Sequence, residues 1–378
     1  MNQIFSNFKR QMFLFILLFN CLPFFVLSLS FAKSLIVPSE YSTIENAINE
    51  ANDGDEIIVS DGIHTGSGNK NLNMPNKSII VKSANGPLSC IIDCENDGRA
   101  FNFDGKGSMI TIDGFTIRNG NVSSYGGWGG GGIYCGQSSP VIKNTIFFQN
   151  TAIYGAGITL FNSNATIFNC VFHGNNASNQ GGGLWLLSCS TLKIDNCTFV
   201  NNSGSQVIWS QDLDHVYITN CLFWGNSGYS VEKYDGGITL NYCLINTNSI
   251  KNNIIAKNII DSDPLLEGTN SQLTVNSPCI DAGISIEGIP TKDIIGNPRK
   301  GRIDIGAFEY QKEYQRLPGD IDGDSLVGLL DVLTLIQFII NESPVIDQTK
   351  GDFTGDGIIN IFDAVKLVKY ITQQIESL

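Results

Sequence analysis

The chain has 378 residues, which is long enough for more than one domain, and its 36 acidic and 23 basic side chains give a net charge of −13. Because phosphate groups attract Lys and Arg, a chain this acidic is not expected to bind nucleic acid. Beyond the N-terminal segment no stretch is apolar enough to span a membrane, so no membrane association is expected for the rest of the chain.

The first 32 residues predict a signal peptide. Lys9 and Arg10 precede an almost wholly apolar run from Met12 to Ala32, and the small residues Ser30 and Ala32 occupy the −3 and −1 positions of a cleavage site after Ala32. The run is also long enough for a retained membrane anchor. The small-residue site favours cleavage and therefore a secreted protein.

The segment that follows predicts a short helix and then a strand. Ser42 is the expected N-cap, and Glu45 three residues later completes a capping box. Residues 53–55 end the helix, and Glu56–Val59 is the expected first strand. The apolar face of the helix comprises Ile44, Ala47, Ile48 and Ala51.

Between residues 34 and 310 the sequence repeats with spacings of 22 to 27 residues. Short β-branched runs with this period and no helical periodicity predict a solenoid of strands, in which equivalent residues stack about 4.8 Å apart. Asparagines in one column can then pass amide hydrogen bonds from coil to coil. The first column is Asn150, Asn175, Asn202, Asn226 and Asn248; the second is Thr145, Cys170, Cys197, Cys221 and Cys243; the third is Asn144, Asn169, Asn196, Asn220 and Tyr242.

Glycine-rich starts of the repeats (131–133, 155–158, 181–184 and 236–238) and Phe-x-x-Asn ends such as Phe147–Asn150 are similar to polymorphic outer-membrane protein repeats. Residues 33–310 as a whole resemble a right-handed parallel β-helix of the pectin-lyase-like type. The resemblance implies a mainly β solenoid on the order of ten coils. It includes a cap helix at the N-terminal end and a closing segment from residue 263 to residue 310.

Nine cysteines follow the signal peptide. Four of them share one column, and side chains stacked in register point in parallel, which suits disulfide geometry poorly. We therefore expect an interior stack of free thiols. Cys90 and Cys94 lie four residues apart and remain candidates for a local disulfide.

From Gly319 onward the chain carries ten acidic and three basic residues, a net charge of −7. Within this segment two loops that start 32 residues apart repeat carboxylates or hydroxyls at positions 1, 3, 5 and 12, and each precedes an apolar-periodic helix, Leu329–Ile340 and Ile361–Ile371. Hard oxygen ligands at alternate positions of a tight loop are typical of a calcium site. The predicted ligands are Asp320, Asp322, Asp324 and Asp331 in the first loop and Asp352, Thr354, Asp356 and Asp363 in the second.

These loops depart from the EF-hand pattern, because position 12 is Asp and no helix precedes either loop. The duplicated loop and helix instead resemble a type I dockerin, a small α-helical module spanning residues 319–378, with residues 311–318 as a linker. The resemblance implies calcium as the cofactor and a cohesin domain of a scaffold or cell-surface protein as the partner. The recognition positions of the family correspond to Leu329, Leu330, Ile361 and Phe362.

Dockerins commonly gather carbohydrate-active proteins, so the resemblance also implies a polysaccharide ligand and leaves two classes of function open. A uronide lyase needs a base and a cation that stabilises the enolate, whereas a glycosidase needs paired carboxylates. The alternative is a non-catalytic binding or structural module. Lys143 and Asp195 share an outward column, but a coil carrying Phe168 separates them, and residues 212–215 are the densest charged cluster. No catalytic residue is assigned.

Aromatic residues are spread through the coils. Rings that face outward can stack on sugars, whereas rings that face inward belong to the core. The sequence does not separate the two groups. The residues are Tyr125, Trp128, Tyr134, Tyr154, Trp185, Trp209 and Trp224.

Overall fold

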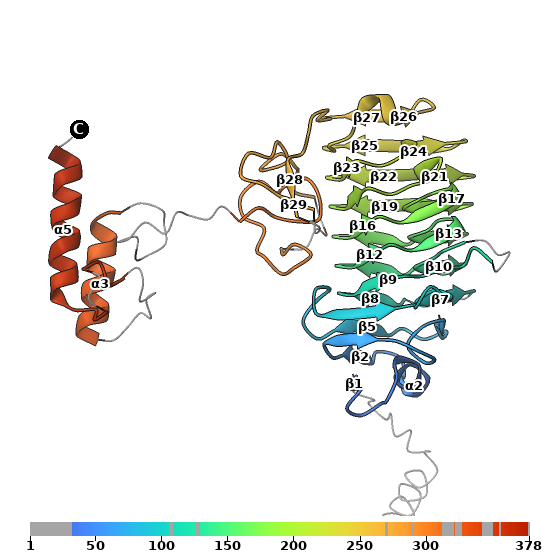
Figure 1. Ribbon diagram of the computed structural model, residues 1–378, viewed down its shortest axis with the longest axis horizontal. Helices are drawn as coiled ribbons and strands as arrows, with labels where there is room; N and C mark the ends of the chain where they lie inside the picture. Colours follow the sequence, from blue (N-terminus) through green and yellow to red (C-terminus); the bar gives the residue numbers. More distant parts are fainter. Residues whose placement is uncertain are drawn as a thin grey trace, which may run out of the picture. The chain divides into compact units, whose positions relative to one another are not determined.

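The computed structural model describes residues 32–105, 109–124, 129–268, 271–286, 288, 291–311, 321, 327–341, 351–354 and 357–376. The predicted signal peptide and nearly all of the predicted linker lie outside these residues. The chain divides into two compact units (Figure 1), and the second comprises residues 272–276 and 310–378. The first unit is a parallel β-solenoid with a closing segment, and the helices of the second follow Gly328.

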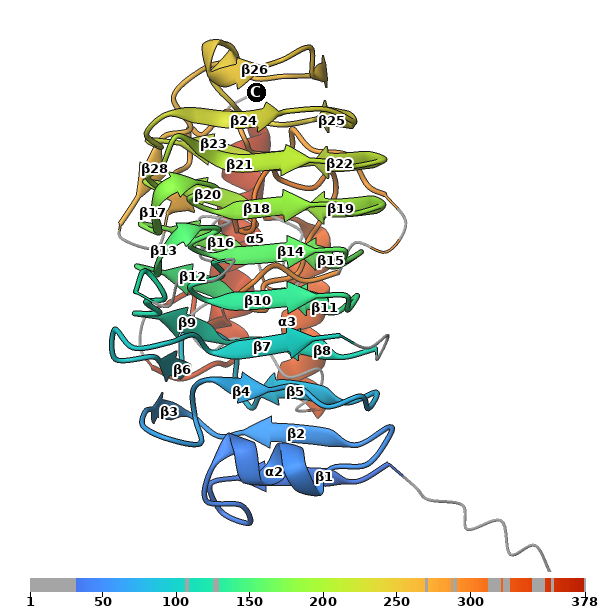
Figure 2. The same cartoon turned by 90° about the vertical axis from the view of Figure 1, so that its right-hand side faces the viewer.

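Three parallel sheets form the faces of the solenoid (Figure 2). Sheet A has ten strands, in the order β1 (Ser34–Val37), β2 (Glu56–Val59), β5 (Ile80–Ser83), β8 (Thr111–Asp113), β11 (Val141–Lys143), β15 (Thr166–Phe168), β19 (Thr191–Asp195), β22 (His215–Thr219), β25 (Gly237–Asn241) and β27 (Ile255–Lys257). Sheet B has seven, in the order β3 (Gly62–His64), β6 (Cys90–Asp93), β9 (Thr116–Arg118), β12 (Ile146–Phe148), β16 (Val171–His173), β20 (Thr198–Val200) and β23 (Leu222–Trp224).

Sheet C has eight strands and lies between the long loops that leave sheet B and the turns that lead into sheet A. Its order is β4 (Leu72–Asn73), β7 (Phe101–Asp104), β10 (Ile133–Gly136), β14 (Ile158–Phe161), β18 (Leu184–Leu187), β21 (Gln206–Gln211), β24 (Tyr229–Lys233) and β26 (Ile250–Lys251). The remaining elements are the paired strands β13 (Thr151–Tyr154) and β17 (Asn176–Gln180), the 3-10 helix η1 (Thr247–Ser249), and the short strands β28 (Leu266–Glu267) and β29 (Gln272–Leu273).

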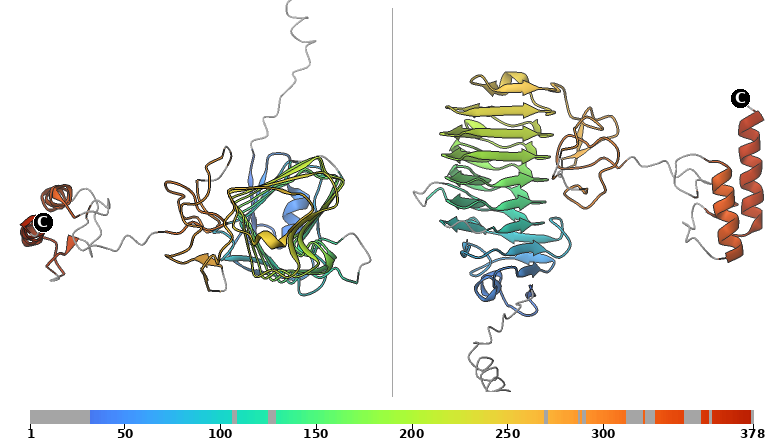
Figure 3. Two further views of the ribbon diagram at one scale, coloured as in Figure 1. Left: turned by 90° about the horizontal axis from the view of Figure 1, so that it is seen from above. Right: turned by 180° about the vertical axis from the view of Figure 1, so that it is seen from behind.

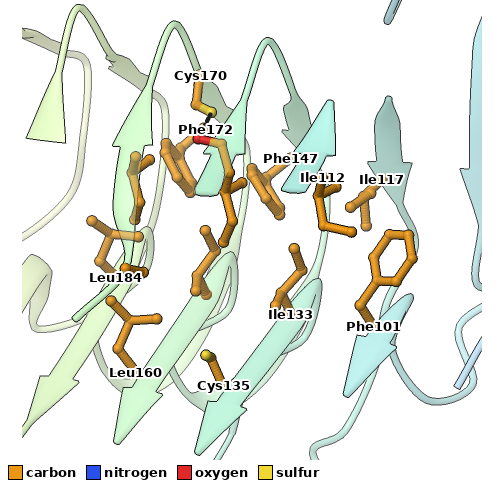
Figure 4. Packing of buried hydrophobic residues seen from close by; sticks show 14 of the residues in the cluster. Phe101, Ile112, Ile117, Ile133, Cys135, Phe147, Leu160, Cys170, Phe172 and Leu184 are labelled. Atoms are coloured by element: carbon orange, nitrogen blue, oxygen red, sulfur yellow. Dashed lines mark hydrogen bonds between the residues drawn. The ribbon is translucent and has the colours of Figure 1, made fainter. Parts of the chain in front are cut away.

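The core is built from columns of identical side chains. Phe147, Phe172, Phe199 and Phe223 pair in register and stack with ring centroids 4.7–4.8 Å apart and nearly parallel planes. Figure 4 shows Phe147 and Phe172 pointing into the interior beside the aliphatic residues of the other two sheets. All four rings are fully buried, so the period in the sequence corresponds to one coil of the solenoid.

The predicted asparagine ladder forms at the turn after sheet B. The amide of Asn175 donates to Asn202 Oδ1 at 2.9 Å and to the carbonyl of Phe147 at 2.9 Å, and its own Oδ1 accepts from the backbone and side-chain nitrogens of Asn150. Asn226 continues the ladder. Asn248, predicted as its last member, is not part of it, because it lies exposed in η1 and its backbone N–H donates to the side chain of Asn246.

A second asparagine column makes the tight turn from sheet A to sheet B. Asn144, Asn169, Asn196 and Asn220 have φ between 49° and 53°, a left-handed conformation that asparagine tolerates better than most residues. Asn169 donates to Asn144 at 3.2 Å, and Asn220 donates to Asn196 at the same distance. The sequence columns are therefore structural columns.

The N-terminal cap differs from the prediction in two details, which are the N-cap residue of its helix and the strand that comes first in sheet A. Helix α2 (Ile44–Glu50) covers the first coil and buries Ile44, Ala47 and Ile48. Its N-cap is Thr43, whose side chain accepts from the backbone of Asn46, rather than Ser42. Glu56–Val59 is the second strand of sheet A, because the preceding β1 already pairs with it.

The cysteine column is confirmed, whereas the candidate disulfide is wrong. Cys170, Cys197, Cys221 and Cys243 are fully buried free thiols, and each donates to a carbonyl of its own or the preceding coil. Cys90 and Cys94 are also buried free thiols; the Cys90 thiol lies 3.8 Å from the carbonyl of Val59. Burial raises the pKa of these thiols and keeps them protonated.

The closing segment packs along the flank of the solenoid instead of over its last coil. Arg299 and Glu309 form a buried ion pair at 2.9 Å, and Arg299 also donates to Asn169 in the A–B turn. The backbone of Ala307 donates to Thr198 on sheet B at 2.9 Å. The contacts of Arg299 with Asn169 and of Ala307 with Thr198 join residues more than a hundred positions apart and attach the segment to the middle coils.

Replacing Asn175 with Ala should lower the free energy of unfolding by about 3 kcal/mol, because the change leaves several buried backbone and amide groups of the ladder without partners. The neighbouring Asn176→Ala is the control, since Asn176 is exposed and should change stability by less than about 0.5 kcal/mol. Denaturant titration of both variants measures the difference. Equal midpoints would show that the ladder contributes little.

Candidate partner-binding and metal sites

Two helices carry the site predicted in the second unit. Helix α3 spans Leu329–Asn341 and helix α5 spans Ile361–Glu376, which confirms both helices predicted from the sequence and extends the second. They pack through a small core to which each helix contributes two buried residues one turn apart. The buried residues of this core are Ile321, Val332, Leu335, Ala364 and Leu367.

The predicted recognition residues lie at the exposed starts of these helices. Leu329 and Leu330 are 70% and 61% exposed, and Ile361 and Phe362 are 52% and 69% exposed. Single exposed apolar side chains are common on protein surfaces, whereas contiguous apolar patches mark interaction sites. The structure thus gives each helix an apolar patch at the same position relative to its loop.

Sequence reasoning missed the next turn of each patch. Leu333 and Val365, four residues after Leu329 and Ile361, are 48% and 46% exposed. The signal was present as helical spacing, because residues i and i+4 share a face. Each patch is therefore at least two turns long.

In the second loop, hydrogen bonds connect three predicted calcium ligands and Asn360. Asp352 Oδ2 accepts from the backbone of Gly357 at 2.7 Å, and its Oδ1 accepts from the hydroxyl of Thr354 at 3.3 Å. Asp363 is fully buried and accepts from the backbones of Thr354 and Asn360, both at 2.8 Å. Loop positions 1, 3, 9 and 12 are thus linked in one network.

The first loop repeats the arrangement at its last position. Asp331 is 1% exposed and accepts from the backbones of Ile321 and Gly328 at 2.6 and 2.7 Å. Asp331 and Asp363 each occupy the third position of a helix. Each carboxylate accepts from the backbone N–H of the residue that precedes the helix, as in the carboxylate half of a capping box. The other predicted ligands, Asp320, Asp322, Asp324 and Asp356, lie outside the described residues.

A calcium ion fits the chemistry of this donor set. Asp331 and Asp363 are buried carboxylates, and each accepts two hydrogen bonds from backbone N–H groups of its own loop. Their loops also supply hydroxyl, amide and backbone oxygens, the hard ligands that calcium takes in sixes to eights. The residues that would hold the ion in the second loop include Asp352, Thr354 and Asp363.

On the solenoid, the register confirms the separation of Lys143 from Asp195. Lys143 pairs with Phe168, and Phe168 pairs with Asp195, so one full coil stands between the two charges. Lys143 itself forms an ion pair with Asp113 at 3.1 Å. Among the described coils, Lys82, Arg118 and Lys251 are likewise ion-paired to carboxylates at 2.7–2.9 Å.

The charged cluster at residues 212–215 is a turn between sheets C and A. Asp212 and Asp214 are exposed, and the backbone of Asp212 donates to Asp235 in the next coil at 2.6 Å. His215 begins β22, and its ring lies 2.9 Å from the hydroxyl of Thr239. The hydrogen bonds hold neighbouring coils together, in line with the interpretation as a solvated turn.

The aromatic residues separate into two groups. Tyr134, Trp185 and Trp209 lie on the outer side of sheet C, yet Trp185 and Trp209 stack on each other at 5.6 Å and are only 4% and 8% exposed. The loops before sheet C cover them, so they are not platforms for a sugar ring. Tyr217 on the outer side of sheet A is 45% exposed. Tyr125 and Trp128 lie outside the described residues.

An apolar groove runs along sheet B beside the closing segment. Its volume is about 260 Å³, and its walls include Pro87, Leu88, Ile91, Phe148 and His173. The groove residues carry no carboxylate, so the groove does not hold the paired acids that glycoside hydrolysis requires.

The model of the family described as right-handed β-helix region matches residues 37–212 and 99–289, and that of the type I dockerin domain matches residues 318–372. The chain is also similar to metabotropic glutamate receptor-like protein R of Dictyostelium discoideum, with 34% identity over 122 residues; the match covers 32% of this chain and 7% of that protein. A crystal structure of pectate lyase Pel9A matches 75% of this chain and 98% of its own, with 15% identity and a TM-score of 0.31. A likeness of this degree says nothing about activity.

No helix among the described residues is long and apolar enough to cross a membrane. The segment predicted as a signal peptide lies outside that part of the chain.

The carboxyl of Asp195 on sheet A provides a test of its own burial. Burial raises the pKa of its carboxyl from 3.8 to about 6, opposed by a hydrogen bond from Thr219 and by the charge of Lys193. The folded state therefore binds the proton more tightly than the unfolded state, so rising pH removes stability between about pH 4 and pH 6.

Asp195→Asn should raise the free energy of unfolding at pH 7 by about 2 kcal/mol relative to the native chain, and the gain should vanish below pH 4. Thermal melting of both proteins across this range measures it. The exposed Asp214→Asn is the control and should show no such dependence. A gain that stays constant with pH would contradict the assigned pKa.

Proposed function

We propose that this member of the right-handed β-helix family is a secreted protein. A cohesin-bearing scaffold or cell-surface protein would bind it through its type I dockerin domain. The β-helix would then be presented to polysaccharide outside the cell. Secretion rests on the predicted cleavage after Ala32 and agrees with the extracellular assemblies in which dockerins occur.

The observation that carries the cohesin proposal is the pair of apolar patches. Each combines two large apolar side chains at a helix start with a third one turn later, and exposed apolar clusters with polar surroundings are typical of protein interfaces. The buried aspartates at the third helical position fix the start of each helix, and so hold these side chains in place.

Calcium is the proposed cofactor of the dockerin. When bound, it would neutralise the carboxylates that crowd the two loops. The chain's own residues would order the loops around it, because Asp331 and Asp363 each already join two backbone nitrogens across their loop. Without the ion, repulsion among the carboxylates opposes that closure.

Removing calcium from the chain that begins at Lys33 should abolish the contribution of α3 and α5 to its circular dichroism and leave the contributions of α2 and of the β-sheets. Added calcium should restore the helical signal, whereas magnesium should restore less because it requires octahedral geometry and retains water. A spectrum that a chelator leaves unchanged would overturn the calcium proposal.

Substitution of the patches tests the partner. Leu329→Asp with Leu330→Asp, or Ile361→Asp with Phe362→Asp, should weaken binding to a panel of recombinant type I cohesins, and all four together should reduce affinity by roughly a hundredfold or more. Ile340→Asp is the matched control, because Ile340 is 71% exposed but lies nearly three turns further along α3. Titration calorimetry in calcium measures all variants. Unchanged affinity in the quadruple variant would contradict the assignment.

Polysaccharide is the proposed ligand of the β-helix, and two roles compete. Their ion pairs argue against Lys82, Arg118, Lys143 and Lys251 as the base of a lyase, which must be free to take a proton, and this is consistent with a binding module. A lyase would instead produce unsaturated uronides that absorb in the ultraviolet.

The chain should therefore be mixed with pectate, alginate and glycosaminoglycans in calcium, while absorbance and new reducing ends are followed. For a binding module we expect neither signal, together with retention on at least one immobilised polysaccharide. A rise in absorbance would establish β-elimination. Absence of both reaction and retention would overturn the polysaccharide proposal while leaving the cohesin proposal intact.

A further inference from the structure

The outer side of sheet A carries an exposed aromatic ring on strand β22. Successive side chains of a strand point to opposite faces, and Val216 and Ile218 of this strand are buried in the core. His215, Tyr217 and Thr219 therefore face outward. The side chain of Tyr217 is 45% exposed, so its ring is accessible to a ligand.

The closing segment covers a different part of the solenoid. Figure 3 shows this segment (orange) along one flank. Arg299 donates from there to Asn169 in the A–B turn, and the backbone of Ala307 donates to Thr198 on sheet B. The exposure of Tyr217 shows that the segment does not extend over the centre of sheet A at β22.

Three residues hold the ring of Tyr217 in place. The ring of His215 lies against it, with centroids 4.4 Å apart and planes inclined by 36°. His215 Nε2 in turn lies 2.9 Å from the hydroxyl oxygen of Thr239 in the next coil. A Cβ at position 237 would collide with the His215 ring, so Gly237 provides the space that this ring occupies. The aromatic surface is therefore formed before a ligand arrives, which lowers the entropy cost of binding.

Groups that can hydrogen-bond to a sugar surround this ring. Lys193 of β19 and Thr239 of β25 are in register with Tyr217, one strand away on either side, and Lys193 is exposed. Asn241 follows as the next outward residue of β25 and is half-buried. The flat apolar face of a tyrosine can stack on a sugar ring, while ammonium, hydroxyl and amide groups beside it bond to the sugar hydroxyls.

The charges near the ring disfavour an acidic ligand. Lys193 and Asp195 lie on the same strand with opposite charges, and the charge of Lys193 lowers the pKa that burial raises at Asp195. In the adjoining turns between sheets C and A, exposed carboxylates outnumber the neighbouring base; they are Asp212, Asp214 and Asp235, against Lys233. The whole chain has a net charge of −13, so a polyanion is repelled both here and at long range.

We propose that the surface formed by Tyr217, Lys193, His215 and Thr239 is a polysaccharide-binding site and that its ligand is an uncharged polysaccharide. This inference rests on the polysaccharide role proposed above and names the site and the class of ligand. Tyr234, which is 75% exposed in the turn that leads into β25, offers a second ring for an extended ligand that crosses neighbouring coils.

Affinity electrophoresis of the chain from Lys33 in gels containing xylan, mixed-linkage glucan or pectate tests the site and the ligand class. We expect xylan or glucan to retard the native chain more than pectate does. Tyr217→Ala should reduce affinity roughly tenfold or more because the stacking surface is lost, whereas Tyr217→Phe keeps the ring and should bind within about twofold of the native chain. Tyr229→Ala is the matched control, because Tyr229 is 39% exposed but lies on sheet C.

A double-mutant cycle tests the role of His215 as a positioning residue. Gly237→Ala should displace the His215 ring and weaken binding severalfold. In the His215→Ala background no ring is left to collide, so adding Gly237→Ala should cause no further loss. An equal loss in both backgrounds would contradict the positioning of Tyr217 through His215.

Four results would overturn the inference, and they separate it from the broader polysaccharide role. Retention by pectate alone would refute an uncharged ligand. Loss of binding in Tyr229→Ala but not in Tyr217→Ala would move the site to sheet C and leave the polysaccharide role intact. A changed sedimentation coefficient of Tyr217→Ala without changed retention would assign this face to a protein contact. No retention of the native chain by any polysaccharide would refute both the site and the role.

Discussion

Parallel pairing of each coil with the next, without a shift in register, is the constraint on which the rest of the structure depends. Residues such as Phe147 and Phe172 stand directly opposite each other in neighbouring strands. The side chain at one position of a coil therefore packs against the side chain at the same position of the next coil, one strand spacing away. Identical residues in one column can then form a ring stack or an amide ladder. A different residue in the same column interrupts a chain of contacts, not a single contact.

The asparagine columns show how polar side chains satisfy this constraint at the turns. Each coil must turn twice within a few residues while burying backbone, and a buried polar group without a partner costs stability. Asn175 donates to Asn202 in the next coil and to Phe147 in the preceding coil, and it accepts from Asn150 in the preceding coil. Asn169 adopts the left-handed turn. The same chemistry attaches the closing segment, because Arg299 binds Asn169 from outside.

The C-terminal unit follows a different principle, since the buried core of its described residues is small. Asp331 and Asp363 fix the helix starts by accepting backbone hydrogen bonds, and they stand at the final ligand position of their loops. Binding of the proposed calcium ion would therefore be coupled to the presentation of the apolar patches through the same two carboxylates. A cofactor would act on the partner surface without touching it.

The sequence by itself determined the features that repeat or that follow from spacing. The columns of Phe, Cys and Asn and the two helices after Gly328 were legible because each reflects a fixed period or offset along the chain. The apolar pairs at the helix starts were identified only through the resemblance to a dockerin. The fifth asparagine and the Cys90–Cys94 disulfide failed, because the last coil is irregular and because Cys90 points into the core.

Only the tertiary structure decided where the non-repeating parts lie. The closing segment binds the flank through Arg299 and Asn169, which are 130 positions apart, and no period encodes such a contact. The same holds for Trp185 and Trp209, which face outward in the strand pattern but are buried. Whether an end or a face is covered depends on long-range packing, and the alternation of a strand reports only which side a residue is on.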